Sequence, residues 1–249
     1  MPALPMHAAG RETLASRLDA CKGIGPGFDS LRLFLALSIV CVHSLPLAHG
    51  FDYYDFRTKT LFPLFLALLP MFFGLSGFLV TGSAKRLLSI PRFLMNRGLR
   101  IAPALVVEVT LSAIVLGAAV TTLPWTEYFT DKGFYAYFLN IIGNIHFELP
   151  GVFKDNPFPA TVNGNLWTLQ PEYYCYLVLA GAMLLGIFKH RRLYVALVGI
   201  GVLAAIALDI VYKIGNPFYA FSSAALVFAF MAGSLLYMCA AYVPVSGWL

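Results

Sequence analysis

The feature that most constrains the fold of this chain is an apolar stretch, FDSLRLFLALSIVCVHSLPLAHG, which runs from Phe28 to Gly50. Its lipid-compatible part, roughly Leu31 to Ala48, has about the length that a bilayer core requires of a helix. An ionisable side chain inside such a span costs free energy, and it is therefore by default a hypothesis for a functional site. His43 is that side chain.

Arg32 and His43 are predicted to share one face of this helix. Eleven positions of about 100° each make roughly three full turns. At about 1.5 Å per residue, the two residues lie roughly 16 Å apart along the axis, with Arg32 near one membrane surface and His43 toward the midplane. Two interpretations stay open at this point. Either the pair belongs to a functional site, or Arg32 anchors the helix at the interface and His43 bonds to a neighbouring helix.

The composition predicts a polytopic membrane protein. Of the 249 residues, 59% are hydrophobic and 12% are charged, whereas soluble domains are about a quarter charged. We therefore expect an all-α, transmembrane helical bundle of six to seven spans. Six are predicted directly: Leu31–Ala48, Leu61–Gly82, Ile101–Leu123, Leu166–Phe188, Leu193–Tyr212 and Phe218–Ala241. The apolar segment Phe134–Phe147 is too short for a simple span and predicts an interfacial or re-entrant helix.

Basic residues predict the topology. Lys and Arg without any acid occupy the stretch 83–100, and a second basic cluster, KHRR, covers Lys189–Arg192. Six spans with a cytoplasmic N-terminus place both clusters in the cytoplasm, as the positive-inside rule requires. The sequence thus predicts a multi-pass protein of the cell (inner or plasma) membrane. Residues 1–27, which lack the apolar core of a signal peptide, form a cytoplasmic N-terminal tail, and residues 28–249 form the membrane domain.

Metal and nucleic-acid partners are not expected. The four cysteines (Cys21, Cys41, Cys175 and Cys239) show no metal-ligand spacing, and three of them fall in apolar spans where they pack as small hydrophobic residues. The lipid bilayer is an expected partner. Within the second span, Gly74, Ser76 and Gly77 form a small-residue patch that predicts the close approach of another helix.

Four stretches, in order, resemble the membrane-bound acyltransferase 3 family. They are FDSLRLFLALSIVCVHS, with ten residues between Arg and His; FFGLSGFLVTG; RFLMNRGLRIAP, with its Arg-x-x-Arg; and NGNLWTLQPEYYCYL. The resemblance covers Phe28 to about Leu177 and implies an integral-membrane O-acyltransferase acting on sugars or related acceptors. Family cores contain about ten spans, so the chain is expected to be a short member or part of a longer protein.

The resemblance implies that His43 is catalytic, and the chemistry agrees. Acyl transfer to a hydroxyl requires a base for the hydroxyl proton, and an imidazole serves near neutral pH. Glu172 stands where the family has an acid after Leu-Trp-Ser/Thr-Leu. It is expected to orient His43 or to meet the acceptor, although structural pairing with a neighbouring helix is an alternative. Glu108, seven residues into the third span, stays unassigned.

The donor and acceptor are also implied by the resemblance. Arg32, Arg97 and Arg100 are expected to bind the phosphates of a cytoplasmic acyl-CoA, most simply acetyl-CoA, because guanidinium groups pair with phosphates. The alternative for Arg97 and Arg100 is a topology signal alone. Trp167 is expected to stack on an acceptor sugar of a cell-surface or exported carbohydrate, unless it belongs to an interfacial aromatic belt.

Two other functions fit the same composition. One is a membrane transporter in which His43, Glu108 and Glu172 form a proton or substrate path. The chain shows no internal repeat of the transporter kind, which counts against this function. The other is a non-catalytic membrane subunit or fragment, which would explain the short chain.

Overall fold

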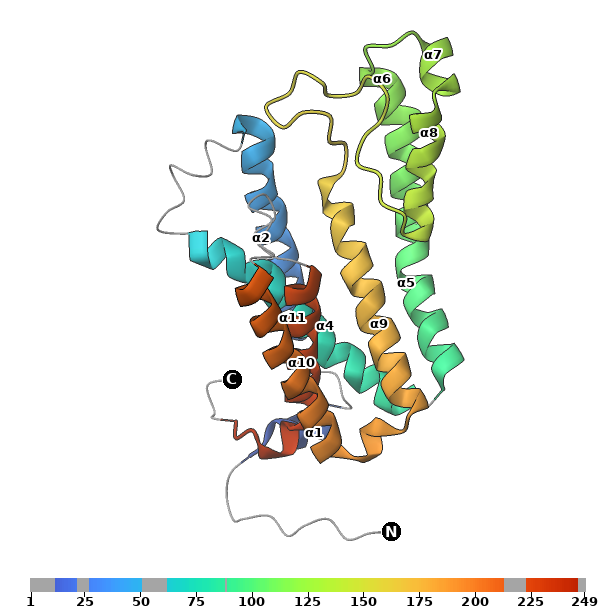
Figure 1. Cartoon of the computed structure of the whole chain (residues 1–249). Helices are drawn as coiled ribbons and strands as arrows, with labels where there is room; N and C mark the ends of the chain where they lie inside the picture. The colour runs from blue at the N-terminus through green and yellow to red at the C-terminus, as the bar shows by residue number, and fades with distance from the viewer. Residues whose placement is uncertain (1–11, 22–26, 51–61, 88, 213–222, 246–249) are drawn as a thin grey trace.

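The computed structural model describes residues 12–21, 27–50, 62–87, 89–212 and 223–245, and Figure 1 shows their arrangement. These residues form helices, turns and loops, with one isolated β-bridge between Thr13 and Pro244. The prediction of an all-α fold is therefore confirmed for them. The long helices are α2 (Phe28–His49), α4 (Phe62–Leu87), α5 (Ile90–Thr110), α9 (Leu169–Leu184), α10 (Arg191–Tyr212) and α11 (Ser223–Met238).

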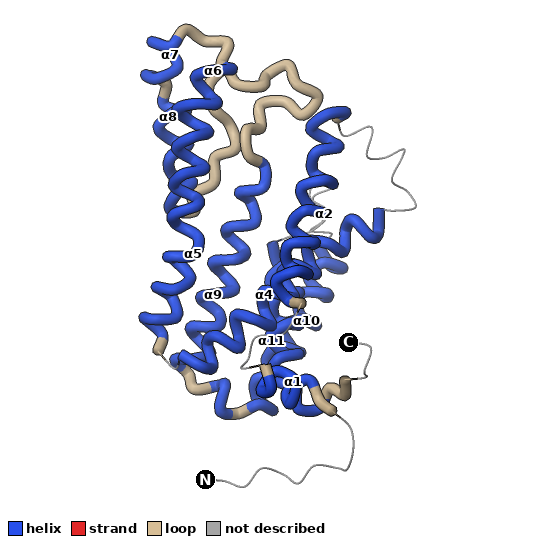
Figure 2. Tube along the Cα trace, turned by 180° about the vertical axis from the view of Figure 1, so that it is seen from behind, coloured by secondary structure: helices blue, strands red, loops and turns tan. Residues whose placement is uncertain are grey.

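Short helices close the two ends of the bundle. At one end, α5 continues through the π-helix η1 (Leu111–Gly117) into α6 (Ala118–Val120). That end also holds α7, α8 and a long loop, which form a cap, and Figure 2 shows the loops of this cap from behind. The opposite end holds α1. The remaining short elements are α1 (Leu14–Ala20), α7 (Trp125–Thr130), α8 (Lys132–Tyr137), η2 (Phe138–Ile142), η3 (Gly164–Thr168), η4 (Ile187–Lys189) and η5 (Ala240–Tyr242).

Fewer helices reach membrane length than the sequence predicts. Among the described residues, three are long and apolar enough to cross a membrane: Phe28–His49, Leu64–Leu87 and Ile90–Val120. The predicted spans at α9 and α11 are helices of 16 residues each. At about 1.5 Å per residue such a helix covers about 24 Å, which is less than a bilayer core of roughly 30 Å. The expectation of six to seven full spans is therefore not met in the described part of the chain.

Several predicted boundaries also move. The third membrane helix begins at Ile90 instead of Ile101, so the predicted cytoplasmic loop is largely the first turns of α5. The segment predicted as an interfacial or re-entrant helix, Phe134–Phe147, contains only the end of α8 and the short η2. The predicted start of the last span, at Phe218, lies outside the described residues, as do residues 1–11 and 22–26 of the predicted tail.

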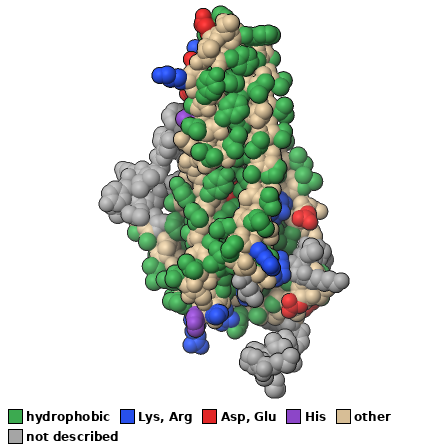
Figure 3. Space-filling view, turned by 90° about the vertical axis from the view of Figure 1, so that its right-hand side faces the viewer, with side chains coloured by type: hydrophobic (Ala, Val, Ile, Leu, Met, Phe, Trp, Pro, Cys, Tyr) green, Lys and Arg blue, Asp and Glu red, His purple; other side chains and the backbone are tan. Residues whose placement is uncertain are grey.

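The outer surface fits a lipid environment. Figure 3 shows hydrophobic side chains over most of one long face, with Lys and Arg concentrated toward one end. On α5 and η1, large apolar side chains are exposed, among them Val106, Val107, Leu111, Ile114 and Val115. Water disfavours an apolar surface of this extent, whereas lipid does not. The chain is a membrane protein.

Both basic clusters lie at the same end of the bundle, as the topology argument predicts. The turn between α4 and α5 and the turn between α9 and α10 both occur at the end that holds α1 (Figure 1). Arg191 stacks on the ring of Tyr242 there, with 4.1 Å between the guanidinium carbon and the ring centroid. Lys85 lies 5.8 Å from the centroid of Tyr237.

The closest helix contact joins α4 and α11 through glycines, which confirms the predicted role of the small-residue patch. A Cβ atom at Gly77 would lie 1.8 Å from the carbonyl oxygen of Phe230, and one at Gly233 would lie 1.8 Å from that of Gly74. No side chain fits at such distances. Beside this crossing, Thr81 donates to the carbonyl oxygen of Gly77 (2.7 Å) and shares a hydrogen bond of 2.6 Å with Ser234.

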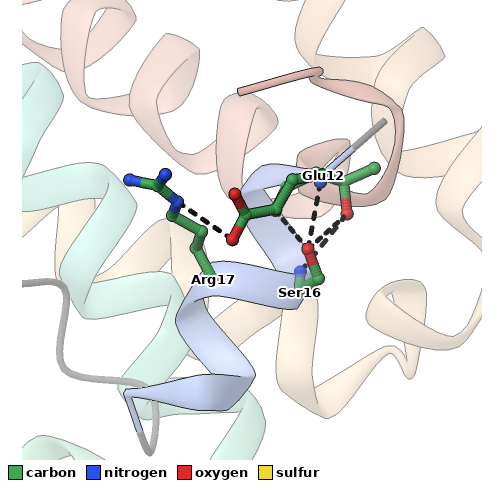
Figure 4. Close-up of polar contacts among 4 residues, drawn as sticks. Glu12, Ser16 and Arg17 are labelled. Carbon is green, nitrogen blue, oxygen red and sulfur yellow. Dashed lines mark hydrogen bonds and ion pairs between the residues drawn. The ribbon is translucent and has the colours of Figure 1, made fainter. Parts of the chain in front are cut away.

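The N-terminal helix is docked on the same end of the bundle. Thr13 caps α1 by a capping box with Ser16, and Glu12 pairs with Arg17 at 3.1 Å (Figure 4). Two further contacts dock α1 on the bundle. The Leu14 amide donates to the carbonyl oxygen of Val243 (2.9 Å), and Leu18 is buried in a cluster with Phe78 and Ala240.

Replacing Gly77 by alanine should destabilise the protein, because the new methyl group must push α11 away from α4. Overpacking of this kind costs about 1–3 kcal/mol or more. We expect a lower midpoint of thermal unfolding in detergent. Gly181→Ala is the matched control, since nothing lies within 4 Å of its added Cβ. Equal midpoints for the two variants would contradict the close packing.

Candidate active site

A cavity of about 190 Å³ lies between α2, α4, α9 and α11. Its wall is mostly apolar and includes the rings of Phe72, Phe73 and Phe230. Five polar side chains also line it: His43 from α2, Ser76 from α4, Asn165 and Thr168 from η3, and Glu172 from α9. The structure thus brings together His43 and Glu172, the two residues predicted to be catalytic, which are far apart in the sequence.

The imidazole of His43 is held by its own helix. Its Nδ1 lies 2.7 Å from the carbonyl oxygen of Ile39, one turn earlier. A carbonyl oxygen only accepts, so Nδ1 carries the proton, and the neutral ring then has its lone pair on Nε2. His43 is half-buried and lines the cavity. In this tautomer its free nitrogen is a base.

Glu172 lies in the first turn of α9, where the helix dipole favours a negative charge. Its Oε1 accepts a short hydrogen bond from the hydroxyl of Tyr176, one turn later. Among the described residues, no hydrogen bond joins Glu172 to His43. The two side chains therefore line the same cavity without a hydrogen bond between them.

The three arginines that are predicted to bind the donor lie near one another. Arg32 on α2 interacts electrostatically with Arg97 and Arg100 on α5. The Arg32 and Arg97 side chains each have a buried Nε that makes no hydrogen bond among the described residues. Asp29 pairs with Arg32 at 3.9 Å, but its side chain is 90% exposed, so this pair contributes little.

Clustered guanidinium groups repel one another, which favours binding of an anion that neutralises them. In the described part of the chain, Arg97 donates a long hydrogen bond, 3.5 Å, to Ser83 Oγ, and Arg100 is exposed. The donor capacity of these side chains is therefore largely unused by the described residues. Phosphate groups accept from such a cluster in paired, charged hydrogen bonds.

Tyr176 connects the arginines to the cavity. It is buried on α9, with its ring edge-on to Phe93 and Phe230. Its hydroxyl donates to Glu172, and the charges of Arg97 and Arg100 act on it. The sequence analysis did not single out Tyr176. The signal was present, since Tyr176 lies one turn after Glu172 on the same helix face.

Trp167, the residue predicted to bind the acceptor, does not line the cavity. It lies in η3 and packs against the main hydrophobic core, while its neighbours Asn165 and Thr168 line the cavity. Its role in acceptor binding stays a prediction. The sequence analysis missed Asn165 and Thr168, whose position depends on the η3 turn, and Ser76, which it assigned to helix packing.

Where the structure describes it, the chain is an all-helical membrane protein in which His43 and Glu172 line one cavity and three arginines of α2 and α5 lie near one another. Residues 26–245 match the acyltransferase domain that defines the acyltransferase 3 family. The chain belongs to the acyltransferase 3 family.

Two curated relatives support this membership. The chain is 34% identical over 181 residues to nodulation protein 10 of Rhizobium leguminosarum bv. viciae, and this aligned region covers 69% of this chain and 47% of the relative. It is 28% identical over 161 residues to the O-acetyl transferase of Shigella phage Sf6, which covers 63% of this chain and 45% of the relative. The chain thus spans less than half the length of these relatives. No solved structure matches the chain.

Removing the hydroxyl of Tyr176 should leave Glu172 without its donor. Since a hydrogen bond to a charged group contributes about 1.5–3 kcal/mol, Tyr176→Phe should lower the midpoint of thermal unfolding in detergent. Tyr174→Phe is the control, because Tyr174 is on the same helix and is exposed. The loss should shrink when Tyr176→Phe is combined with Glu172→Gln, which removes the charge. A loss of equal size in both backgrounds would show that the carboxylate is not the partner.

Proposed function

We propose that this chain is the acyl-transferring part of an integral-membrane O-acyltransferase. It moves an acetyl or similar acyl group from acyl-CoA to a hydroxyl of a cell-surface or exported carbohydrate. The observation that carries the proposal is the shared cavity of His43 and Glu172, with the arginine cluster joined to it through Tyr176. The printed name of the phage relative, O-acetyl transferase, supports the reaction class.

The proposed step balances with groups on the chain. The Nε2 atom of His43 takes the proton of the acceptor hydroxyl as its oxygen attacks the thioester carbonyl. The C–O bond forms, the C–S bond breaks, and the imidazolium returns the proton to the leaving thiolate, which gives the ester and free CoA. Glu172 stabilises the imidazolium charge or orients the acceptor hydroxyl. The apolar wall limits water, which would otherwise hydrolyse the thioester.

The donor is proposed to enter from the side of the basic clusters. The phosphates of acyl-CoA pair with Arg32, Arg97 and Arg100, and the thioester extends toward His43. By the positive-inside rule this end lies on the cytoplasmic side of a bacterial inner membrane. Acyl-CoA is made in the cytoplasm. The acceptor then approaches from the opposite end, where η3 and the cap lie.

The reaction is tested by measuring O-acetyl groups on the surface polysaccharide by NMR. A deletion strain is complemented with wild type, with His43→Ala or with His49→Ala. Acetyl signals should return with wild type and with His49→Ala, because His49 does not line the cavity. They should be absent with His43→Ala at equal membrane levels. If His43→Ala also restores the signals, His43 is not the base, as expected of a transporter or a non-catalytic subunit.

The donor site is tested by binding of acyl-CoA to purified protein. Arg97→Gln combined with Arg100→Gln should weaken binding at least about tenfold, since each lost charged hydrogen bond contributes about 1.5–3 kcal/mol. Arg92→Gln is the control, because Arg92 lies on the same helix and is exposed. Unchanged affinity of the double variant in a calorimetric titration would reduce the arginines to topology signals.

A further inference from the structure

A second polar cluster lies on the cap side of the cavity, and its centre is Glu108, which the proposed mechanism does not use. Glu108 is on α5, on the same helix as Arg97 and Arg100 but about two turns closer to the cap. Its Oε1 accepts from Ser112 Oγ (2.9 Å) and from the side-chain amide of Asn163 (2.7 Å). The bond to Asn163 joins α5 to the loop that precedes α9.

The second oxygen of Glu108 is also enclosed. Its Oε2 is buried and makes no hydrogen bond among the described residues. Nearby, the Tyr137 side chain of α8 is fully buried. Burial, followed by the charge of Glu108, raises the pKa of Tyr137 to about 12, so its hydroxyl keeps its proton. A partly buried carboxylate with one enclosed oxygen relies on its few donors, which makes the bond to Asn163 costly to lose.

Asn163 connects Glu108 to the cavity wall through hydrogen bonds. Because its Nδ2 donates to Glu108, its Oδ1 faces the other way and accepts from the backbone amide of Asn165 (3.2 Å). Asn163 is the N-cap of η3. Within η3, Thr168 Oγ1 donates to the carbonyl oxygen of Asn165 (2.9 Å). Asn165 and Thr168 are the two η3 side chains that line the cavity.

We propose that Glu108 is a positioning residue for acyl transfer, which holds η3 through Asn163 and so fixes Asn165 and Thr168 at the cap-side wall of the cavity. This inference rests on the proposed function. Glu108 itself does not line the cavity. It acts on the acceptor side, away from the arginine cluster, so it should affect use of the acceptor and leave acyl-CoA binding unchanged.

The restraint of η3 by Glu108 and Asn163 is tested by a labelling experiment that does not depend on activity. The Thr168→Cys substitution is made in a chain in which Cys21, Cys41 and Cys239 are replaced by serine. The rate at which maleimide labels the new cysteine then reports access to the cavity wall. Cys175 stays in place because it is fully buried. Glu108→Ala and Asn163→Ala should each raise the labelling rate about tenfold, the size expected for one lost hydrogen bond to a charged group.

Glu108→Gln should label at nearly the wild-type rate, because its side-chain carbonyl still accepts from Asn163. Glu127→Ala is the matched control, since Glu127 is an exposed acid of the same end of the protein. Labelling rates that are equal in Glu108→Ala and Glu127→Ala would overturn the inference. If Glu108→Ala fails to insert, Asn163→Ala decides, because it removes the same hydrogen bond while Glu108 stays in place and still accepts from Ser112.

The consequence for transfer is measured on the same variants. Glu108→Ala should lower kcat/KM for a carbohydrate acceptor about tenfold, with the KM for acetyl-CoA unchanged, and Glu108→Gln should restore most of the loss. A matching rise in the KM for acetyl-CoA would indicate a general structural defect and overturn the positioning role. If wild type transfers no acetyl group, the proposed function fails, while the labelling rates still decide whether Glu108 holds η3.

Discussion

The contact on which the rest of the structure depends is the crossing of α4 and α11. Backbone meets backbone there, because Gly74, Gly77 and Gly233 leave no side chain between the helices. Between apolar helices in lipid, such close packing supplies the attraction that the hydrophobic effect supplies in water. The crossing fixes Phe72, Phe73 and Ser76 on one side and Phe230 on the other, and these four residues form much of the cavity wall. The other two helices of the site, α2 and α9, then close the cavity.

Polar groups inside the bundle are arranged by the requirement that each has a partner. Tyr176 donates to Glu172, Nδ1 of His43 donates to Ile39, and Thr81 bonds to Ser234. Among the described residues, five buried side-chain atoms lack a hydrogen bond: the Nε atoms of Arg32 and Arg97, Glu108 Oε2, the Tyr137 hydroxyl and His146 Nε2. Unpaired buried donors are costly unless a ligand uses them. The two guanidinium nitrogens belong to neighbouring positive charges, which is the arrangement that the proposed binding of an anion requires.

Much of this site could be predicted from the sequence, because single ionisable residues in apolar helices are rare. His43 and Glu172 stood out for that reason, and both line the cavity. The three arginines were predicted from the family resemblance and their charge; Arg32 interacts electrostatically with Arg97 and Arg100, and their role in donor binding stays a prediction. The helix ends were predicted less well. The stretch 90–100 was read as a loop because of its basic residues, yet its apolar positions continue the helical period into α5. Hydropathy also overestimated α9, since it does not detect that the 3₁₀ helix η3 replaces the first turn of the predicted span.

The parts of the site that were missed depend on loops and on helix irregularities. Asn165 and Thr168 reach the cavity only because η3 turns the chain before α9, and a turn of this kind leaves no periodic signal. The π-helix η1 directly follows the segment that carries Glu108. Extra residues in a helical turn shift the register of the carbonyl groups, and here Tyr128 donates to the carbonyl oxygen of Ala113 (2.6 Å). A Cβ at Gly117 would lie 1.9 Å from the same hydroxyl.

The cap is thus tied to α5 at the π-helix and again at Glu108, whereas Arg97 and Arg100 lie earlier on the same helix. One helix therefore carries two of the three clustered arginines and, nearer the cap, the carboxylate that anchors the loop before α9. Eight residues separate Arg100 from Glu108, which corresponds to about 12 Å along the axis. That spacing is fixed by backbone hydrogen bonds and does not depend on loop conformation. If Arg97 and Arg100 bind the donor as proposed, α5 sets the distance between the donor and the acceptor-side wall, and the loops above it can vary in sequence without disturbing the transfer geometry.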